Sequence, residues 1–547
     1  MFRDALTGAL TAGGARVAVL DETTASSYAE LDAWSSSLAD TLRPLVRTPE
    51  DCTALLLPNG GSWLAAYLAA HKAGTAVAPM NAVLTEHEIV RVLEHLRPRA
   101  LLTSPDRSDD IKALCAGRRL HVDVIVVTPG RHGLCGPREA AGAAKTRADT
   151  DRLADTGHMA DVSRVADTDR VADTNRVADT NRVADTGRLA DTPCMIMHTS
   201  GSTGSCRPVV QTERALHLAT GFWSSRHRGP EDVVAVPIPL AHTYGHLAAI
   251  STLLAGATLL TSSRAFGPAW WLEQLVARDV TVIEAVPTVY RRLLEAVGPG
   301  WRPAALRLCL SAGQQTPADL RRDWHRRTGV ELLQSWGMTE LSGAGLSPTA
   351  DCCRDSAGIP VPGLEVSVTD PQSPGRPVPA GTVGELWVRG SQVTPGYRTS
   401  SGQMASVTDD EGWLRTGDLV VRDEHECVRI VGRSKDTIMT GGYSVQPAEI
   451  EDVLRTHPEV EDAAVIARAD RRRGEVPHAV IVLRHDSRPD AEELLSHCRD
   501  LLARYKVPRS IDFAERLPLS ATGKLDRAAL RVRYSAPEQE DTPHVVA

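Results

Sequence analysis

The chain has 547 residues, of which 42% are hydrophobic and 24% charged, and its formal net charge is −8. This length exceeds a single compact core and indicates at least two domains. Neither a basic stripe for nucleic acid nor an apolar run of membrane-spanning length occurs, and the ten cysteines are scattered without a C-x-x-C pair. A zinc site and a disulfide framework are therefore not expected, and the expected location is the reducing cytoplasm.

Helix and strand patterns alternate over the first 130 residues. An apolar stripe at helical spacing predicts a helix over residues 28–42, and a second helix is expected over 63–72. Short apolar runs at 53–57, 76–79 and 122–127 are typical of strands. This alternation predicts a layered α/β domain with a largely parallel sheet.

Residues 151–192 form a tandem hexad of the type Asp-Arg-Leu-Ala-Asp-Thr, repeated about seven times with variants. Six residues advance an α-helix by roughly 600°, so the aliphatic positions do not share one helical face. One interpretation is a flexible surface insert without a catalytic role. The other is a short ordered solenoid or contact surface, since aliphatic–small pairs recur every six residues.

A loop of small and hydroxylated residues follows the apolar run 195–197, which predicts a buried strand opening into a ligand-binding loop. Its members are Thr199, Ser200, Gly201, Ser202, Thr203 and Gly204. The glycines allow close approach of the backbone and the hydroxyls add hydrogen bonds, which favours phosphate as the ligand. It is not a Walker A loop, because Arg207 stands where that pattern requires lysine.

After this loop the α/β pattern continues to about residue 335. Residues 360–432 alternate in hydrophobicity, notably at 364–369 and 384–389, and predict a small antiparallel β subdomain. Short helices and strands return over 436–531, long enough for a small separate domain.

Five further segments carry groups suited to chemistry. They are Pro239–Gly245 with its histidine, Gln334–Glu340 with a hydroxyl beside a carboxylate, Trp413–Asp418, Gly432–Ile438 at the apparent domain boundary, and Pro518–Lys524 with a lysine after glycine. In these motifs, their order and their spacing, the chain resembles the adenylate-forming (AMP-binding) superfamily. That superfamily includes acyl-CoA synthetases, aryl-acid ligases, luciferase and the adenylation domains of peptide synthetases.

The resemblance covers nearly the whole chain except the hexad insert and the tail. It implies an α/β fold whose large N-terminal domain, residues 1–432, holds two layered α/β subdomains and a small β subdomain. A hinge at 433–435 then leads to a small mobile α+β C-terminal domain over 436–534, followed by a tail at 535–547.

The resemblance also implies a two-step reaction with ATP, Mg²⁺ and CoA. A small carboxylic acid attacks the α-phosphorus of ATP to give an acyl-adenylate and pyrophosphate, and a thiol then displaces AMP. Phosphate charge makes such a site depend on cations and backbone donors. Alternatives are a carrier protein or an amine as acceptor, nitrite activation by a diazotase of the same superfamily, and an inactive nucleotide-binding relative.

Roles transfer to the positions that match these motifs. The loop Thr199–Gly204, with Arg207, is expected to hold the β- and γ-phosphates. Thr339 is expected at the α-phosphate and Glu340 at Mg²⁺, a cation that prefers hard oxygen ligands. Asp418 is expected to accept both ribose hydroxyls with help from Arg433.

The remaining roles concern adenine, the acid and domain motion. Trp336 and Gly337 are expected beside adenine, with the backbone of Gly313, Gln314 and Gln315 on its other side. Lys524 is expected to bridge the attacking carboxylate and the α-phosphate, and Lys435 to be the hinge. His242 matches the gate of the acyl pocket, although His246 lies one turn on and leaves open which histidine is structural. The run 471–473 is either a solvated charged loop or a contact for the CoA 3′-phosphate.

The chain departs from the family motifs at two places. The phosphate loop of relatives usually continues Gly-x-Pro-Lys-Gly-Val, whereas this chain has Gly204-Ser-Cys-Arg-Pro-Val209, and Met439 replaces a frequent lysine. Arginine keeps the charge and can still contact phosphate. The segment 239–244 lacks the Asp of enzymes that activate amino acids, 310–317 resembles benzoate-type ligases, and 342–345 are small. An aryl or aryl-acrylic acid is therefore favoured over a short or medium fatty acid.

Overall fold

A computed structural model describes residues 1–22, 24–48, 50–128, 191–200, 206–298, 301, 303–349, 355–440, 443–470, 474–485, 487–520 and 524–534. The predictions for residues 151–190, 201–205, 471–473 and 535–547 fall outside these ranges. For Thr199 and Ser200 only the backbone is described.

The first sheet has seven strands in the order β13-β12-β11-β9-β10-β1-β2. Every neighbouring pair is parallel except β1 with β2. The strands are β1 (Val17–Leu20), β2 (Ala25–Ser27), β9 (Val233–Ala235), β10 (Thr258–Leu260), β11 (Val282–Ala285), β12 (Leu308–Ser311) and β13 (Leu332–Gln334).

The second sheet has eight strands in the order β19-β18-β8-β7-β4-β3-β5-β6. Its β7-β4-β3-β5-β6 half is parallel, whereas β7, β8, β18 and β19 pair antiparallel. The strands are β3 (Cys52–Leu56), β4 (Ala76–Met80), β5 (Ala100–Thr103), β6 (Asp123–Val126), β7 (Pro193–Ser200), β8 (Cys206–Thr212), β18 (Gly396–Arg398) and β19 (Met404–Ala405).

One hydrophobic cluster joins the two sheets to the helices between them. It contains Leu55 and Val77 from the second sheet and Val234 and Leu259 from the first. Ten of the twelve residues of α3 are buried, which explains why this helix is apolar on all sides. The helices of these layers are α1 (Phe2–Gly13), α2 (Tyr28–Leu42), α3 (Gly61–Lys72), α4 (Glu86–Leu96), α5 (Ser108–Gly117), α8 (Glu213–His227), α9 (Thr243–Leu254), α10 (Pro268–Ala277), α11 (Pro287–Ala296) and α12 (Ala318–Thr328).

A four-stranded antiparallel sheet in the order β16-β17-β20-β21 follows. Its strands are β16 (Leu364–Thr369), β17 (Val383–Gly390), β20 (Leu414–Arg422) and β21 (Val428–Arg433), and the short pair β14 (Leu346–Ser347) and β15 (Ile359–Pro360) precedes them. The small antiparallel β subdomain predicted from the sequence is therefore present.

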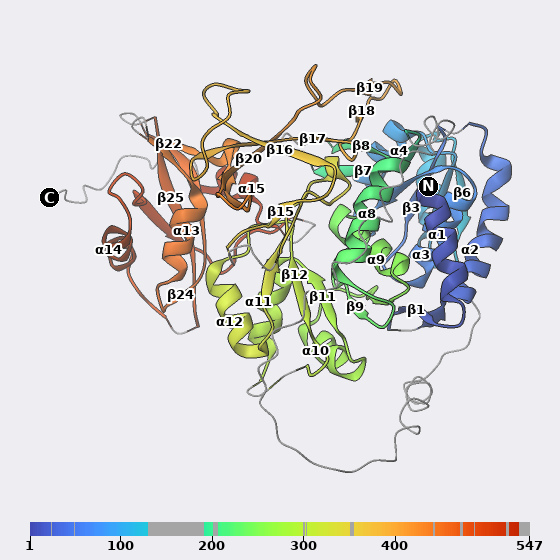
Figure 1. The fold of residues 1–547 in the computed structure, drawn as a ribbon, viewed down its shortest axis with the longest axis horizontal. Coiled ribbons are helices and arrows are strands. Elements are labelled where there is room, and N and C mark those ends of the chain that lie inside the picture. The colour runs from blue at the N-terminus through green and yellow to red at the C-terminus, as the bar shows by residue number, and fades with distance from the viewer. Residues whose placement is uncertain are drawn as a thin grey trace, which may run out of the picture.

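The C-terminal elements form a small α+β unit, which lies at the opposite end of the molecule from α1–α3 (Figure 1). Its strands are β22 (Ile438–Thr440), β23 (Tyr443–Val445), β24 (Val460–Asp470), β25 (Gly474–Leu483) and β26 (Ser510–Phe513), and its helices α13 (Pro447–Arg455), α14 (Ala491–Leu501) and α15 (Arg527–Tyr534). The predicted α/β fold with a β subdomain and a small α+β C-terminal unit is confirmed.

The cysteines differ in one respect from the sequence expectation. Cys52, Cys115, Cys194, Cys309 and Cys498 are free and buried. Cys427, just before β21, is disulfide-bonded. Cysteine spacing did not indicate this bond, because pairing depends on which loops the fold brings together.

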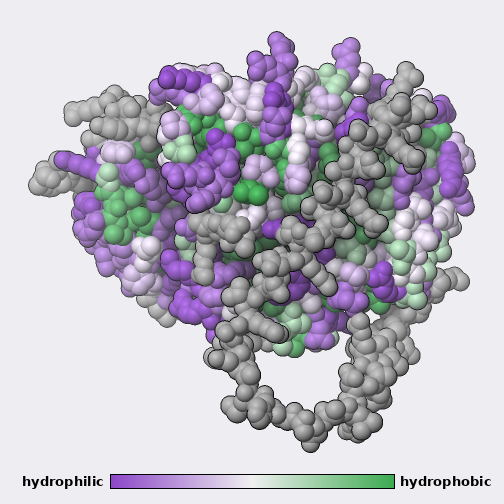
Figure 2. Space-filling view, in the orientation of Figure 1, coloured by the Kyte–Doolittle hydropathy of each residue, from purple (hydrophilic) through white to green (hydrophobic). Residues whose placement is uncertain are grey.

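No described helix combines the length and the apolar character needed to cross a bilayer. On the face shown in Figure 2 the described surface is mostly hydrophilic, with hydrophobic residues in small patches.

The end of the hexad repeat belongs to the folded domain. Thr192 O accepts a hydrogen bond from Glu213 N at 3.1 Å, and Asp191 pairs with Arg214 at 3.3 Å. We therefore expect a deletion of residues 151–190 to leave ATP-dependent chemistry within about twofold of wild type, since the strand β7 that follows keeps its anchors. Acid-dependent pyrophosphate release tests this, and a loss of tenfold or more with an unchanged melting temperature would assign the repeat a role in the reaction.

Candidate active site

The candidate site lies where several strands of the first sheet end. β12 ends at Ser311, two residues before Gly313, and β13 ends at Gln334, two residues before Trp336. The carboxyl ends of parallel strands meet at one edge of a sheet, which is where α/β folds commonly bind ligands. This topology brings together two predicted segments that are more than twenty residues apart in sequence.

Asp418 is the best-supported carboxylate of the site. The register of β20 on β21 places Asp418 directly opposite Arg433, and Arg433 Nε donates to Asp418 Oδ1 at 2.6 Å. Trp336 Nε1 donates to the other carboxylate oxygen at 2.9 Å. The Asp418 side chain is only 4% exposed, and its charge raises the pKa of Arg433. Asp418 is thus held in one orientation by two donors from different elements.

Trp336 is packed more tightly than its predicted place beside adenine suggested. Its indole is 9% exposed, and a Cβ built on Gly345 would lie 2.5 Å from the ring atom Cζ3. Gly345 therefore covers part of the ring, and Asp418 fixes its edge.

Thr339 begins the short 3-10 helix η4 (Thr339–Leu341) and is held on two sides. Thr243 Oγ1 donates to Thr339 Oγ1 at 3.0 Å, and Gln211 Nε2 donates to Thr339 O at 2.8 Å. Gln211 is fully buried in β8. The strand that leaves the phosphate loop therefore fixes the backbone of the predicted α-phosphate contact.

Glu340 is 8% exposed, and its carboxylate has a partner from β18. Tyr397 OH donates to Glu340 Oε1 at 2.8 Å. The guanidinium carbon of Arg207 lies 5.5 Å from the centroid of the Tyr397 ring. The residue that replaces the usual lysine of the phosphate loop thus lies close to the predicted metal carboxylate.

The two histidines of α9 and its start have different surroundings. Asn81 Nδ2 donates to His242 Nε2 at 3.0 Å, and His242 lies just before the helix. His246 is fully buried, with its Nε2 2.8 Å from the Tyr67 hydroxyl. His246 is therefore the packed member of the pair, and the role of His242 as the gate stays a prediction.

Burial gives these histidines a predictable effect on stability. Burial lowers the pKa of His242 to about 4 and that of His246 to about 3. It also lowers the pKa of a third histidine, His198 in β7, to about 4. An unfolded histidine titrates near 6.5, so between pH 6.5 and about 4 the unfolded chain binds more protons than the folded one. The stability contribution is complete above pH 6.5 and is lost as pH falls, at roughly 1.4 kcal/mol per pH unit for each histidine.

We expect His246→Gln to reduce the difference in unfolding free energy between pH 7.5 and pH 5. Urea denaturation at both pH values checks this, and an unchanged difference would contradict it.

Lys524 comes from the C-terminal unit yet lies beside the end of β12. A Cβ built on Gly313 would lie 3.4 Å from Lys524 Cε and 3.7 Å from Nζ. Crowding by surrounding protein, together with the charge of Arg433, lowers the Lys524 pKa, and Asp418 opposes this shift. The structure therefore places the predicted bridging lysine next to Gly313, within electrostatic reach of Asp418 and His242.

Lys435 is exposed in the short helix η5 (Ser434–Asp436), between β21 and the C-terminal unit. A pocket of about 400 Å³ adjoins it, lined by Glu385, Thr416, Gly417, Arg433, Ser434 and Lys435. Its lining includes Arg433, which pairs with Asp418.

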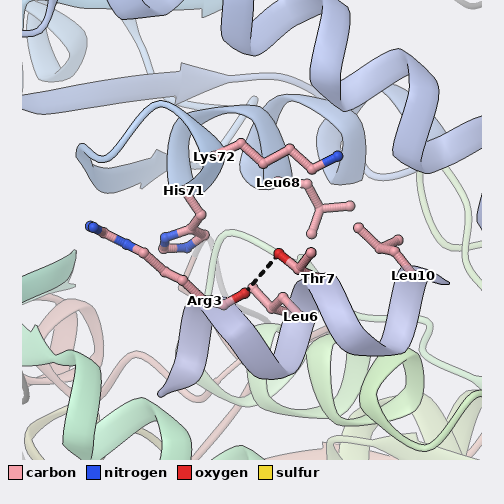
Figure 3. Close-up of a pocket in the computed structure, with 7 residues that line it drawn as sticks. All are labelled: Arg3, Leu6, Thr7, Leu10, Leu68, His71 and Lys72. Carbon is pink, nitrogen blue, oxygen red and sulfur yellow. Dashed lines mark hydrogen bonds between the residues drawn. The ribbon is translucent and has the colours of Figure 1, made fainter. Parts of the chain in front are cut away.

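A second cavity lies away from these residues. It measures about 30 Å³ between α1 and α3, where Thr7 donates to the Arg3 carbonyl at 3.0 Å (Figure 3). That volume has room for about one water molecule, so this cavity is too small for the reactants.

Sequence reasoning missed Asn81, Gln211 and Tyr397. Asn81 follows the end of the parallel strand β4, a location that could have identified it. Gln211 and Tyr397 reach the site through strand pairing between distant segments, for which the sequence carries no local signal. Gln314 and Gln315 lie in the loop after β12 as expected.

The chain is similar to known proteins over most of its length. The family described as AMP-binding enzyme matches residues 8–398, and the AMP-binding enzyme C-terminal domain matches residues 449–524. A feruloyl-CoA synthase from an Amycolatopsis species is 32% identical over 523 residues, covering 93% of this chain and 94% of the relative.

Two solved structures illustrate the same similarity. ATP-bound MatB from Rhodopseudomonas palustris has a TM-score of 0.81 and 27% identity over 98% of this chain and 99% of its own. A benzoate CoA ligase from Burkholderia xenovorans LB400 has a TM-score of 0.76 and 25% identity over 96% and 99% of the two chains.

Proposed function

This chain belongs to the family of AMP-binding enzymes, and from that premise we propose that its acid substrate is an aryl or aryl-acrylic acid. It is an ATP-dependent, AMP-forming acid–thiol ligase: it makes an acyl-adenylate with release of pyrophosphate and then transfers the acyl group to CoA.

The aryl assignment rests on a strip of small residues, 342–345, beside an aromatic side chain. Gly343 has a φ of +95°, and a Cβ there would lie 3.1 Å from Thr243 Cγ2 and 3.2 Å from Leu247 Cδ2. Tyr244 is half-buried next to this strip and donates to Leu310 O at 3.2 Å. The lack of side-chain bulk along this strip, together with the neighbouring Tyr244 ring, would suit an acid that carries a planar ring. The feruloyl relative and the benzoate relative are named for aryl acids, which supports the same choice.

The tight packing of Gly337 keeps this strip in place. A Cβ built on Gly337 would lie only 1.8 Å from Gly343 O. Any side chain at 337 would therefore displace the Gly343 backbone and distort this strip.

In the first half-reaction, Asp418 and Arg433 would bind the ribose hydroxyls, and Thr339 would donate to the α-phosphate. Thr199–Gly204 and Arg207 would bind the outer phosphates. Neutral His242, fixed by Asn81, would close the acyl side without adding charge. Lys524 would bring the acid carboxylate and the α-phosphate together and stabilise the charge that develops between them.

Glu340 fits a magnesium ion in the chemistry of its donor atoms. Its carboxylate supplies hard oxygens next to the hydroxyl of Thr339, and Mg²⁺ is commonly held by one or two carboxylates together with substrate phosphates. When bound, Mg²⁺ would neutralise charge on the phosphates. Glu340 would be its protein ligand.

The test is pyrophosphate release across matched acids, with and without CoA, and with products identified by mass. Benzoic, cinnamic and hydroxycinnamic acids are compared with hexanoic and octanoic acids. We expect aryl acids to give the higher kcat/KM and an acyl-CoA product. A preference for aliphatic acids would overturn the substrate class, and adenylate formation without a thioester would move the acceptor to a carrier protein or an amine.

A further inference from the structure

Strand pairing places Arg207 near two other segments, those of Thr199 and Tyr397. In the pairing of β7 with β8, Arg207 lies opposite Thr199, where the phosphate loop begins. In the pairing of β8 with β18, Tyr397 lies opposite Val209. Arg207 is two residues before Val209, so it is a diagonal neighbour of Tyr397 on one face of the sheet. Strand pairing alone therefore brings the guanidinium over the Tyr397 ring, 5.5 Å from its centroid.

Tyr397 also contacts Glu340. Its hydroxyl donates to Glu340 Oε1 at 2.8 Å. Thr394 N, just before β18, donates to Glu340 O at 2.8 Å. The same segment thus holds Glu340 by its backbone and by its carboxylate.

The arginine at this position has properties that lysine lacks. Its guanidinium is planar, so it can lie over an aromatic ring while its N–H groups reach neighbouring acceptors. A carboxylate has about four lone-pair positions, so one bond from Tyr397 leaves it able to bind a cation. Partners that orient a metal-binding carboxylate typically change metal affinity by about 10- to 100-fold when removed.

We propose that Arg207 and Tyr397 are positioning residues that link strand β8 to the orientation of the Glu340 carboxylate. Arg207 fixes the Tyr397 ring, and the Tyr397 hydroxyl fixes Glu340. This inference rests on the proposed role of Glu340 in holding the divalent cation that accompanies ATP. It assigns a role to Arg207, which replaces the usual lysine after the phosphate loop.

The experiment measures Mn²⁺ binding without turnover. Wild type and variants are titrated with Mn²⁺ in the presence of α,β-methylene-ATP, and free Mn²⁺ is followed by electron paramagnetic resonance. Tyr397→Phe is expected to weaken Mn²⁺ affinity about tenfold, and Arg207→Lys about threefold. Because both act through one chain of contacts, the double variant is expected to be no weaker than Tyr397→Phe alone.

Arg389→Lys is the matched control, since Arg389 also lies over an aromatic ring, 4.6 Å from the Trp413 centroid, on the exposed side of β17. It is expected to bind Mn²⁺ as wild type does. Nucleotide affinity in EDTA is expected to be equal in wild type, Tyr397→Phe and Arg389→Lys, which a general loss of structure would not allow.

The possible outcomes separate this inference from the proposed function. Wild-type affinity in Tyr397→Phe, or additive losses in the double variant, would overturn the coupling and leave the ligase function standing. Absence of nucleotide-dependent Mn²⁺ binding in wild type would overturn both the role of Glu340 and this inference.

Discussion

Replacing Lys524 by methionine is expected to lower the rate of acyl-adenylate formation by about 10²–10³-fold. Methionine keeps much of the side-chain length but removes the charge that would lie between the carboxylate and the α-phosphate. Lys524 is beside Gly313 in this arrangement, so the loss falls on the half-reaction that this arrangement performs. Single-turnover pyrophosphate release measures it directly.

The control for this variant is Lys506→Met, which removes another lysine of the C-terminal unit, paired with Glu449 at 2.5 Å. It is expected to release pyrophosphate as wild type does. Thiolysis of a preformed acyl-adenylate by CoA is expected to survive in Lys524→Met. An equal loss in both half-reactions would show that Lys524 acts on the structure and not on adenylation.

Asp418→Asn is expected to raise the KM for ATP by about 100-fold and to change kcat much less. The carboxylate accepts from Arg433 and Trp336 and would also accept from the ribose hydroxyls, and hydrogen bonds to a charged group contribute about 1.5–3 kcal/mol each. Asparagine keeps the shape but loses the charge and one acceptor oxygen.

A nucleotide without ribose hydroxyls tests the proposed role of Asp418 most directly. With 2′,3′-dideoxy-ATP, wild type and Asp418→Asn are expected to bind with affinities that differ by no more than about threefold, because the hydroxyls are gone. Asp232→Asn is the matched control, since Asp232 is a buried carboxylate that pairs with Arg307 at 2.6 Å away from the site. Persistence of the full 100-fold difference with the dideoxy nucleotide would contradict the ribose assignment.

Local elements were largely predictable from the sequence. The helix expected at 28–42 is α2 at the same residues, started by Ser27 and Glu30, which cap each other's backbone N–H groups. The strand expected at 364–369 is β16. These elements depend on periodicity and on caps, which short stretches of sequence contain.

The contacts of the site were less predictable than the motifs. The sequence identifies Asp418 and Arg433 as candidates, but their direct pairing depends on the register of β20 with β21. Tyr397 escaped notice because its contact with Glu340 joins segments 57 residues apart in the chain. Only the burial of each side chain distinguishes His242 from His246. Both histidines have apolar neighbours in the sequence, and only the structure shows that Tyr67 lies beside His246.

The location of Lys524 on a different unit from the other candidate groups has a consequence for the direction of the reaction. Asp418, Thr339 and Glu340 belong to the N-terminal domain, whereas Lys524 follows β26 in the C-terminal unit. A group that assists bond formation assists the reverse reaction equally while it stays in place. Its withdrawal after pyrophosphate leaves would therefore raise the barrier to resynthesis of ATP from the adenylate. Placing this one lysine on a separate unit would thus make the first half-reaction effectively one-way.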